Sequence, residues 1–253
     1  MAPPKGEKAP ERARRLLIER MLNGTHPPGS TLPGERALAK EIGVARPALR
    51  EALQGLARNG WISVQHGKPT QVNHFMRDGN LNVLIDLLQA DINLLPDFVP
   101  NLLEMWSLVA PTYTRRAVEA DGQAIADLLA GFRGLDDRPA PYVRAQWRLH
   151  RTLIDSGGNP VYGLVLNSFG DFYARLAQRY LADPARRAAA CDFWEELRQA
   201  ALSGDAGRAA SAMQRYMDGI RAQWAQLNVS EWVSEAGQGG EMLPRLDEDE
   251  RER

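Results

Sequence analysis

The segment from residue 32 to residue 61 constrains the fold most, because it fits two short amphipathic helices separated by a single glycine. Apolar side chains recur at helical spacing on both sides of this glycine, at Ala37, Leu38, Ile42, Leu49, Leu53 and Leu56. Gly43 supplies the sharp turn between the helices, and Asn59 followed by Gly60 is typical of a helix end. We therefore predict helices near residues 34–41 and 46–58, which form a helix-turn-helix over about Glu35 to Gln54.

The flanking residues complete a larger motif. An apolar repeat predicts one more helix before the segment, at Leu16, Leu17, Met21 and Leu22. After the segment, residues 61–65 and 70–73 alternate partly between apolar and polar, and residues 66–69 form a turn, which predicts a β-hairpin. This order of helices and hairpin is that of a winged helix-turn-helix domain, which we place at residues 12–75.

The rest of the chain has helical periodicity throughout. Helices are predicted near residues 80–92, 97–119, 121–132, 139–156, 160–181, 184–203 and 205–228. Asn159 and Asp183 each place a capping side chain before a proline at the first helical position. The predicted fold class is mainly α, with an N-terminal winged helix-turn-helix domain, whose wing is a two-stranded β-hairpin, and a C-terminal all-helical bundle of six to seven helices.

The two ends of the chain differ in composition from the domains between them. We expect a disordered arm at residues 1–11 and a disordered acidic tail at residues 231–253, since both are poor in apolar residues. A linker is expected at residues 76–79, and a helical effector-binding and dimerisation domain at residues 80–230. The effector site is expected in the interior of this helical domain.

The overall net charge of −1 hides an asymmetry along the chain. Residues 1–77 hold 13 basic residues and six glutamates, for a net charge of +7, whereas residues 78–253 have a net charge of −8. Such a difference is typical of a small module that binds a polyanion, joined to an acidic body that does not.

Membrane and secreted classes are disfavoured by the sequence. No stretch approaches the ~18 consecutive apolar residues of a membrane span, and the N-terminal residues lack the apolar core of a secretory signal. The single cysteine, Cys191, excludes an internal disulfide and a multi-cysteine zinc site, and we expect it to be a buried helical residue. We predict a cytoplasmic protein without a cofactor.

Three arginines of the helix-turn-helix are candidate contacts to double-stranded DNA. The second helix of such a motif enters the major groove with its N-terminal end near the base edges. Arg46 stands at that end, where a guanidinium can donate two hydrogen bonds to guanine. Arg50 lies one turn later and can contact a phosphate or a base, and Arg36 can approach the same groove from the preceding helix.

The tip of the predicted hairpin offers a second contact. His66, Gly67 and Lys68 combine a ring that can donate, a bare backbone and a cation. Glycine lets the chain come close to the wall of a minor groove. An ordinary hairpin turn is the alternative interpretation of these three residues.

These motifs resemble the GntR family of bacterial regulators. The residues that carry the likeness are Pro-Pro-Gly at 27–29, Leu-Pro-Gly-Glu-Arg at 32–36, Gly-Val-Ala-Arg at 43–46, Leu-Arg-Glu-Ala-Leu at 49–53 and Gly-Trp at 60–61. Within the family, the chain is similar to the FadR-like regulators of fatty acid metabolism through residues 60–75, 156–167, 173–175, 179–180 and 215–216. The likeness extends over roughly residues 12–228.

The resemblance implies a homodimeric repressor, and at some promoters an activator, that binds palindromic DNA upstream of fatty acid genes and is released by long-chain acyl-CoA. It implies base contacts from Arg36, Arg46, His66 and Gly67, and backbone contacts from Arg50 and Lys68. The resembled regulators carry threonines where this chain has alanine or proline, at Ala45, Pro47 and Ala48. These hydroxyls would cap the second helix and touch DNA, so their loss predicts a changed operator preference.

The resemblance also implies an effector pocket, formed by Trp106, Tyr180, Tyr216, Met217, Ile220 and Trp224. The resembled pocket has arginine, glycine and serine where this chain has Trp106, Met217 and Ile220. These apolar side chains cannot contact an anion, so the pocket prefers another chain length or presents the nucleotide differently. Nearby aromatic residues fit either the pocket or plain core packing, namely Phe169, Phe172, Tyr173 and Tyr180.

Three other functions remain open at this point. Many relatives in the family hold a divalent metal through an aspartate and three histidines, but only His150 stands at such a position here, with Gln146 and Tyr216 at two others. The effector could also be a different small carboxylate or acyl ligand. An acyl-CoA-handling enzyme is the third alternative; His150, Asp155 and Ser156 are close in sequence but lack a nucleophile elbow.

Overall fold

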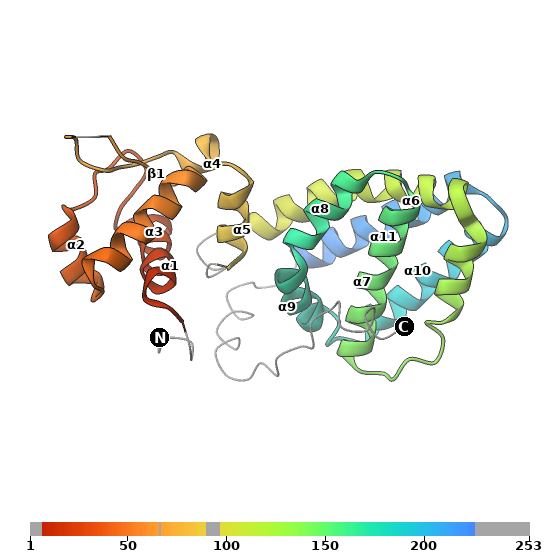
Figure 1. The fold of residues 1–253 in the computed structure, drawn as a ribbon. Helices are drawn as coiled ribbons and strands as arrows, with labels where there is room; N and C mark the ends of the chain where they lie inside the picture. Colours follow the sequence, from red (N-terminus) through yellow and green to blue (C-terminus); the bar gives the residue numbers. More distant parts are fainter. Residues whose placement is uncertain (1–6, 66, 90–96, 226–253) are drawn as a thin grey trace. The chain divides into compact units, whose positions relative to one another are not determined.

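The computed structural model describes residues 7–65, 67–89 and 97–225 (Figure 1). It divides into two compact units, with the division between residues 96 and 97. The predicted acidic tail at residues 231–253 lies outside the described residues.

The first unit contains a three-helix core and a short hairpin (Figure 1). Its elements are α1 (Ala9–Leu22), α2 (Glu35–Ile42), α3 (Arg46–Asn59), β1 (Ile62–Ser63), β2 (Gln71–Val72), α4 (Phe75–Asp78) and α5 (Leu81–Gln89). The order confirms the predicted winged helix-turn-helix, in which β1 and β2 form the wing.

In this unit glycines end α2 and α3, and leucines fill the core between the helices. Gly43 ends α2 with a φ of 74° and Gly60 ends α3 with a φ of 93°, both in the left-handed region that glycine enters without strain. The predicted leucines of α3 are buried, and Trp61 is fully buried directly after the helix. Ile62 pairs with Val72 in the antiparallel hairpin, so the wing continues from the core. Ala37 is exposed, contrary to the sequence prediction, and Ala39 faces the core in its place.

The structure extends the first unit at both ends relative to the sequence prediction. Helix α1 begins at Ala9, within the segment expected to be a disordered arm. Residues Phe75–Asp78 form the helical turn α4 where a linker was expected. Helix α5, whose residues the sequence analysis placed in the helical domain, packs against α3 and falls within the first compact unit.

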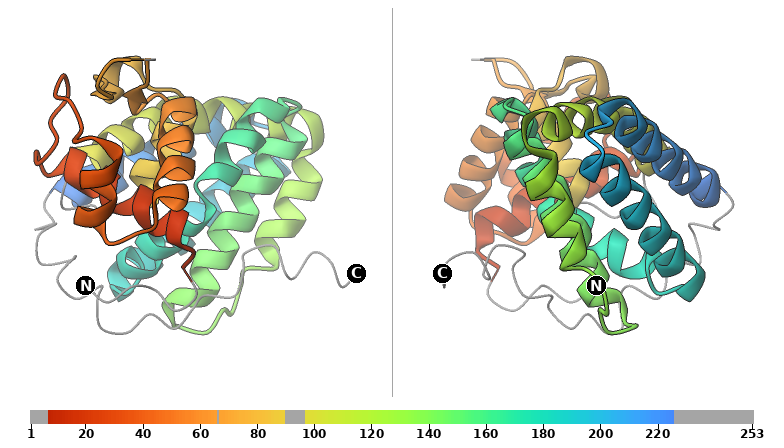
Figure 2. Two further views of the ribbon diagram at one scale, coloured as in Figure 1. Left: turned by 60° about the vertical axis from the view of Figure 1, so that its left-hand side comes forward. Right: turned by 90° about the vertical axis from the view of Figure 1, so that its right-hand side faces the viewer.

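The second unit is entirely helical in the residues that the structure describes. Its elements are α6 (Phe98–Ala130), α7 (Pro139–Ser156), α8 (Pro160–Ser168), α9 (Gly170–Tyr180), α10 (Pro184–Leu202) and α11 (Ala206–Ala225). Helix α6 packs against α7, α10 and α11, and α10 and α11 form an antiparallel pair, drawn in blue in the right-hand view of Figure 2. This arrangement confirms the predicted helical bundle.

Three of the predicted helices differ from the structure at single residues, because two of them are joined and the third is divided. The helices predicted at residues 97–119 and 121–132 are joined in α6, with non-helical backbone at Asp121 (φ −156°, ψ 76°). The single helix predicted at residues 160–181 is interrupted at Phe169 and becomes α8 and α9. The interruption allows α9 to follow its own direction over α7.

The core of the bundle is aromatic and aliphatic. Helix α10 turns Ala190, Phe193, Trp194 and Leu197 inward. Cys191 is exposed on the same helix, which corrects the expectation that it is buried, since it lies about 100° around the helix axis from Ala190. None of the described helices is long and apolar enough to cross a bilayer.

Candidate functional site

The N-terminal end of α3 presents two arginines to solvent. Ala45 precedes the helix without a side-chain cap, and Arg46 is the first helical residue. The Arg46 and Arg50 side chains are 56% and 58% exposed. Glu35, at the start of α2, accepts a hydrogen bond of 2.7 Å from Arg50 Nε, and its Oε2 lies 3.7 Å from Arg46 Nη2. One carboxylate thus holds both guanidinium groups beside the start of α2.

The remaining cationic candidates of the first unit are also exposed. Arg36 follows Glu35 on α2. In the wing, Gly67 has a φ of 74° and open space around it, and Lys68 is exposed and donates its backbone N–H to Gln65. His66 lies outside the described residues. Since a helix end with arginines can donate to base edges and an exposed lysine can neutralise a phosphate, this face has the chemistry to bind a duplex.

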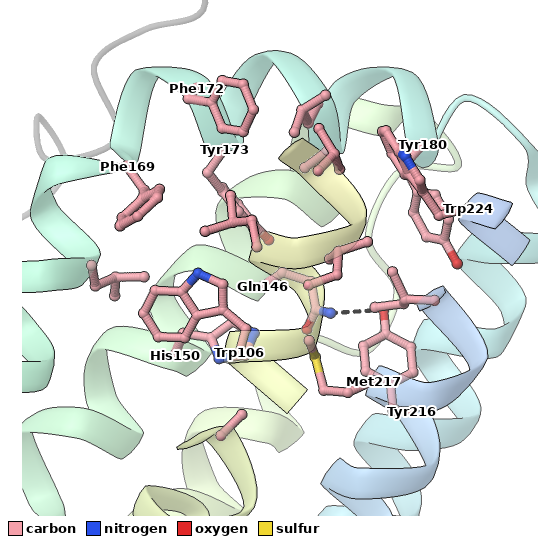
Figure 3. A pocket seen from close by; sticks show the side chains of 18 of the residues that line it. Trp106, Gln146, His150, Phe169, Phe172, Tyr173, Tyr180, Tyr216, Met217 and Trp224 are labelled. Atoms are coloured by element: carbon pink, nitrogen blue, oxygen red, sulfur yellow. Dashed lines mark hydrogen bonds between the residues drawn. The ribbon is translucent and has the colours of Figure 1, made fainter. Parts of the chain in front are cut away.

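The second unit encloses a pocket between α6, α7, α9 and α11 (Figure 3). It contains about 950 Å³ of space between the side chains, including open solvent at its mouth. The lining is formed by Val99, Leu102, Leu103, Trp106, Ala110, Tyr113, Gln146, His150, Leu166, Phe169, Phe172, Tyr173, Leu176, Ala177, Tyr180, Leu181, Tyr216, Met217, Ile220 and Trp224. All six effector residues predicted from the resemblance are among them.

The apolar part of the lining comes mainly from α6, α9 and α11. Trp106 packs edge-on against Phe169, with ring centroids 5.9 Å apart. Met217 is buried and Ile220 is half-buried on α11. These are the positions at which the resemblance implies polar or small residues, so the lining here is more apolar and bulkier than the resemblance implies.

Charge is missing from the pocket wall. Among the lining residues that the structure describes, none is an aspartate, glutamate, lysine or arginine. Burial lowers the pKa of His150 to about 4, so its imidazole is neutral at pH 7. Arg186, which is not a lining residue, places its guanidinium 4.7 Å from the centre of the Tyr180 ring. The pocket therefore suits an uncharged, apolar ligand or the apolar part of a larger one.

Two polar pairs lie at the inner wall. Tyr113 Oη is 2.7 Å from His150 Nδ1, and burial raises the pKa of the Tyr113 hydroxyl. Gln146 Nε2 donates to Tyr216 Oη at 2.7 Å, and Trp194 Nε1 donates to Gln146 Oε1 at 2.7 Å. Of the residues considered for a metal site, Gln146 thus contacts Tyr216, whereas His150 pairs with Tyr113. In the described residues, no three His, Cys, Asp or Glu side chains gather as they would around a metal ion.

The sequence did not point to Tyr113 or to the buried Asp86 of the first unit. Tyr113 belongs to a long apolar helix. In such a helix the sequence pattern of an aromatic residue that packs in a core is the same as that of one that lines a pocket. Asp86 had a signal, since it is a lone carboxylate within the apolar residues of α5. It accepts hydrogen bonds from Trp61 Nε1 at 2.7 Å and Asn59 Nδ2 at 3.1 Å, and it pairs with Arg14.

Comparison with known protein families matches both units. Residues 10–72 match the model of bacterial regulatory proteins of the gntR family, and residues 73–230 match the model of the FadR C-terminal domain. The fatty acid metabolism regulator protein of Shewanella pealeana is 35% identical over 215 residues, which cover 85% of this chain and 90% of that protein. That of Yersinia pestis is 38% identical over 185 residues, covering 73% and 77%.

One solved structure is similar in fold. It is that of Lar, described as controlling the expression of the Listeria monocytogenes agr system, with a TM-score of 0.58 and 18% identity. The match covers 89% of this chain and 100% of that chain. At this identity the likeness concerns the fold alone.

Proposed function

Because the chain belongs to the GntR family of bacterial regulatory proteins and carries a FadR C-terminal domain, we propose that it regulates fatty acid metabolism and leaves DNA when long-chain acyl-CoA binds. Members of this family are DNA-binding transcription regulators and not enzymes. In this proposal a homodimer in the cytoplasm binds a palindromic operator. It represses genes of fatty acid degradation and activates genes of synthesis.

The exposed cations of the first unit support the DNA contacts in this proposal. Arg46 and Arg36 read base edges in the major groove, together with His66 and Gly67 at the wing, while Arg50 and Lys68 bind the phosphate backbone. In the free protein Glu35 contacts both Arg46 and Arg50. Binding to DNA therefore exchanges a carboxylate for a phosphate or a guanine edge, and operator affinity falls as salt concentration rises.

The uncharged lining of the pocket is the observation that carries the proposed effector. A fatty acyl chain is apolar along its length and fits a wall of aromatic and aliphatic side chains, whereas the phosphates of coenzyme A stay outside that wall. A small carboxylate is disfavoured, because none of the described lining residues offers a cation to neutralise it. The effector is thus an acyl ligand in this proposal, with most of its contacts to the chain.

Release from DNA requires that the acyl ligand bind two conformations of the dimer with different affinities. In this proposal the ligand binds more tightly to the conformation in which the two DNA-binding units do not fit the operator. The ligand then shifts the population away from the conformation that binds DNA.

An electrophoretic mobility shift assay tests both halves of the proposal. The full-length protein is bound to the upstream DNA of fatty acid genes and titrated with C8 to C18 acyl-CoA esters. We expect a specific shift that long chains reverse and free coenzyme A does not.

A pair of variants links release to the pocket. Ala177→Trp places an indole inside the pocket, and Leu164→Trp places the same ring on the exposed surface of α8. We expect both variants to bind the operator, and only Ala177→Trp to resist release by acyl-CoA. Release of both variants at the wild-type concentration of acyl-CoA would contradict the pocket as the effector site.

A further inference from the structure

Of the described cations that contact DNA in the proposed function, only the two arginines of α3 are paired with a carboxylate. Glu35 Oε2 accepts a hydrogen bond of 2.7 Å from Arg50 Nε and lies 3.7 Å from Arg46 Nη2. Arg36 and Lys68 make no ion pair with any residue that the structure describes. The pairing is thus confined to the start of α3, the part of the motif that enters the major groove.

The pairing lowers the positive charge that the start of α3 presents to a duplex. Two guanidinium groups and one carboxylate sum to a net charge of +1, where the arginines alone would carry +2. Both arginines are exposed and Glu35 is half-exposed beside them. A phosphate that approaches either arginine therefore also approaches the carboxylate of Glu35.

The carboxylate acts differently on the two kinds of acceptor that DNA offers. A phosphate carries a formal charge, so a carboxylate beside the contacting arginine repels it. The O6 and N7 atoms of guanine are uncharged acceptors on a base edge, and the same carboxylate repels them much less. Binding to nonspecific DNA depends on phosphates, whereas binding to an operator adds contacts to base edges. Glu35 thus opposes nonspecific binding more strongly than operator binding.

We propose that Glu35 is a specificity-determining residue, which lowers the affinity of the first unit for nonspecific DNA by pairing with Arg46 and Arg50. This proposal rests on the proposed function, since it concerns how the arginines of α3 distinguish an operator from other DNA. Glu35 acts through the arginines and is therefore a positioning residue. Its negative charge, rather than a contact to a base, provides the discrimination.

The test compares the full-length wild-type protein with Glu35→Gln by fluorescence anisotropy. The probes are a duplex from the upstream DNA of a fatty acid gene and a scrambled duplex of the same length and composition, each titrated at several KCl concentrations. We expect Glu35→Gln to bind the scrambled duplex roughly 2- to 5-fold more tightly, with a smaller gain on the upstream duplex. The ratio of the two affinities therefore falls. The salt slope on the scrambled duplex becomes steeper by about one unit, because one more cation is free to neutralise a phosphate.

Two further variants separate the proposed role from a general effect of charge. Glu41→Gln makes the same change of charge on the same helix, but Glu41 pairs with Arg20, which is not a proposed DNA contact. We expect Glu41→Gln to leave the ratio of affinities at the wild-type value. Glu35→Asp keeps the negative charge, so we expect it to keep the wild-type salt slope.

The ratio of affinities also separates this role from a purely structural one. A loss of folded protein weakens both duplexes alike and leaves the ratio unchanged. An unchanged ratio for Glu35→Gln, or an equal fall of the ratio for Glu41→Gln, would overturn the specificity role of Glu35. If the wild-type protein itself did not prefer the upstream duplex, the proposed function would be refuted instead.

Discussion

Glu35 contacts Arg46 and Arg50, the two arginines of α3 that contact DNA in our proposal. All three residues lie in the helix-turn-helix. The sequence predicted the arginines, because a recognition helix is identified by its spacing and its turn. It did not predict their contact with Glu35, since a carboxylate at the start of a helix is equally typical of a favourable interaction with the helix dipole.

Arg46→Ala tests base recognition. Loss of a bidentate contact to guanine should cost about 1–3 kcal/mol at the operator and relax discrimination at one base pair. Competition binding with operator variants, each changed at one position, measures this effect.

Lys68→Ala serves as the comparison for Arg46→Ala. Loss of a phosphate contact should weaken binding to all sequences alike and reduce the salt slope by about one unit. If Arg46→Ala also weakened every sequence equally, its role as a base contact would be wrong.

Burial of His150 makes the folding stability of the protein depend on pH. The folded protein holds the pKa of His150 at about 4 through burial, against about 6.5 in an unfolded chain. Between these values the unfolded chain binds more protons, so the folded state loses stability as pH falls from 6.5 to 4, by up to about 3 kcal/mol. Urea unfolding at pH 7 and pH 4.5 should show a smaller decline for His150→Gln than for wild type. An equal decline would mean that His150 is not buried as a neutral ring.

Pocket residues could be predicted only where the resemblance named them. Trp106, Tyr216 and Met217, which the resemblance named for an effector site, are among the lining residues of this pocket, whereas the pocket position of Tyr113 needed the structure. The sequence pattern cannot separate a core from a pocket, because both place aromatic residues at helical spacing. A pocket differs from a core in what its side chains leave unfilled, which depends on distant helices.

At the level of elements, helix ends were predicted best where the sequence contains a cap. Asn159 and Asp183 accept hydrogen bonds from the backbone at the starts of α8 and α10, as their positions before proline predicted. The break at Phe169 was missed. Gly170 begins α9 directly after the break, but a Cβ there would make only ordinary van der Waals contact with the Trp147 ring, at 3.5 Å, so the glycine does not explain the break.

Helix α5 is attached to the first unit through one carboxylate. Asp86 is buried, and its partners are Arg14 of α1, Asn59 of α3 and Trp61, which follows α3 after Gly60. Asp86→Ala leaves the buried Trp61 N–H without its acceptor and should cost about 1–3 kcal/mol of stability. Hydrogen exchange should accelerate in α5 of the variant.

Asn82→Ala is the control on the same helix, since Asn82 is exposed and its substitution should change stability by at most about 0.5 kcal/mol. Unchanged exchange in α5 of Asp86→Ala would show that apolar packing alone holds the helix.

At the scale of the whole molecule, the charge asymmetry of the sequence indicated one part that binds a polyanion and another part that does not. The positive part corresponds to the helix-turn-helix unit and the negative part to the helical unit. The structure divides between residues 96 and 97. The contacts of Asp86 that link α5 to α1 and α3 are not visible in the amphipathic periodicity of α5.

Coupling between the proposed sites must be reciprocal. If acyl-CoA weakens operator binding by a given factor, saturating operator DNA weakens acyl-CoA binding by the same factor. Calorimetric titration of dodecanoyl-CoA into the free protein and into the protein–operator complex measures both affinities. An acyl-CoA affinity that operator DNA leaves unchanged would rule out acyl-CoA as the allosteric effector.

Because the described wall of the pocket has no formal charge, the binding affinity of a ligand should depend mainly on the length of its hydrocarbon chain. Each methylene group that leaves water contributes about 0.8 kcal/mol, so two extra carbons should tighten binding about 15-fold until the space is full. Beyond that length the bulk of Trp106 and Met217 opposes further carbons. The affinity of the pocket for its ligand would then follow chain length and change little with ionic strength, in contrast to the affinity of the first unit for DNA.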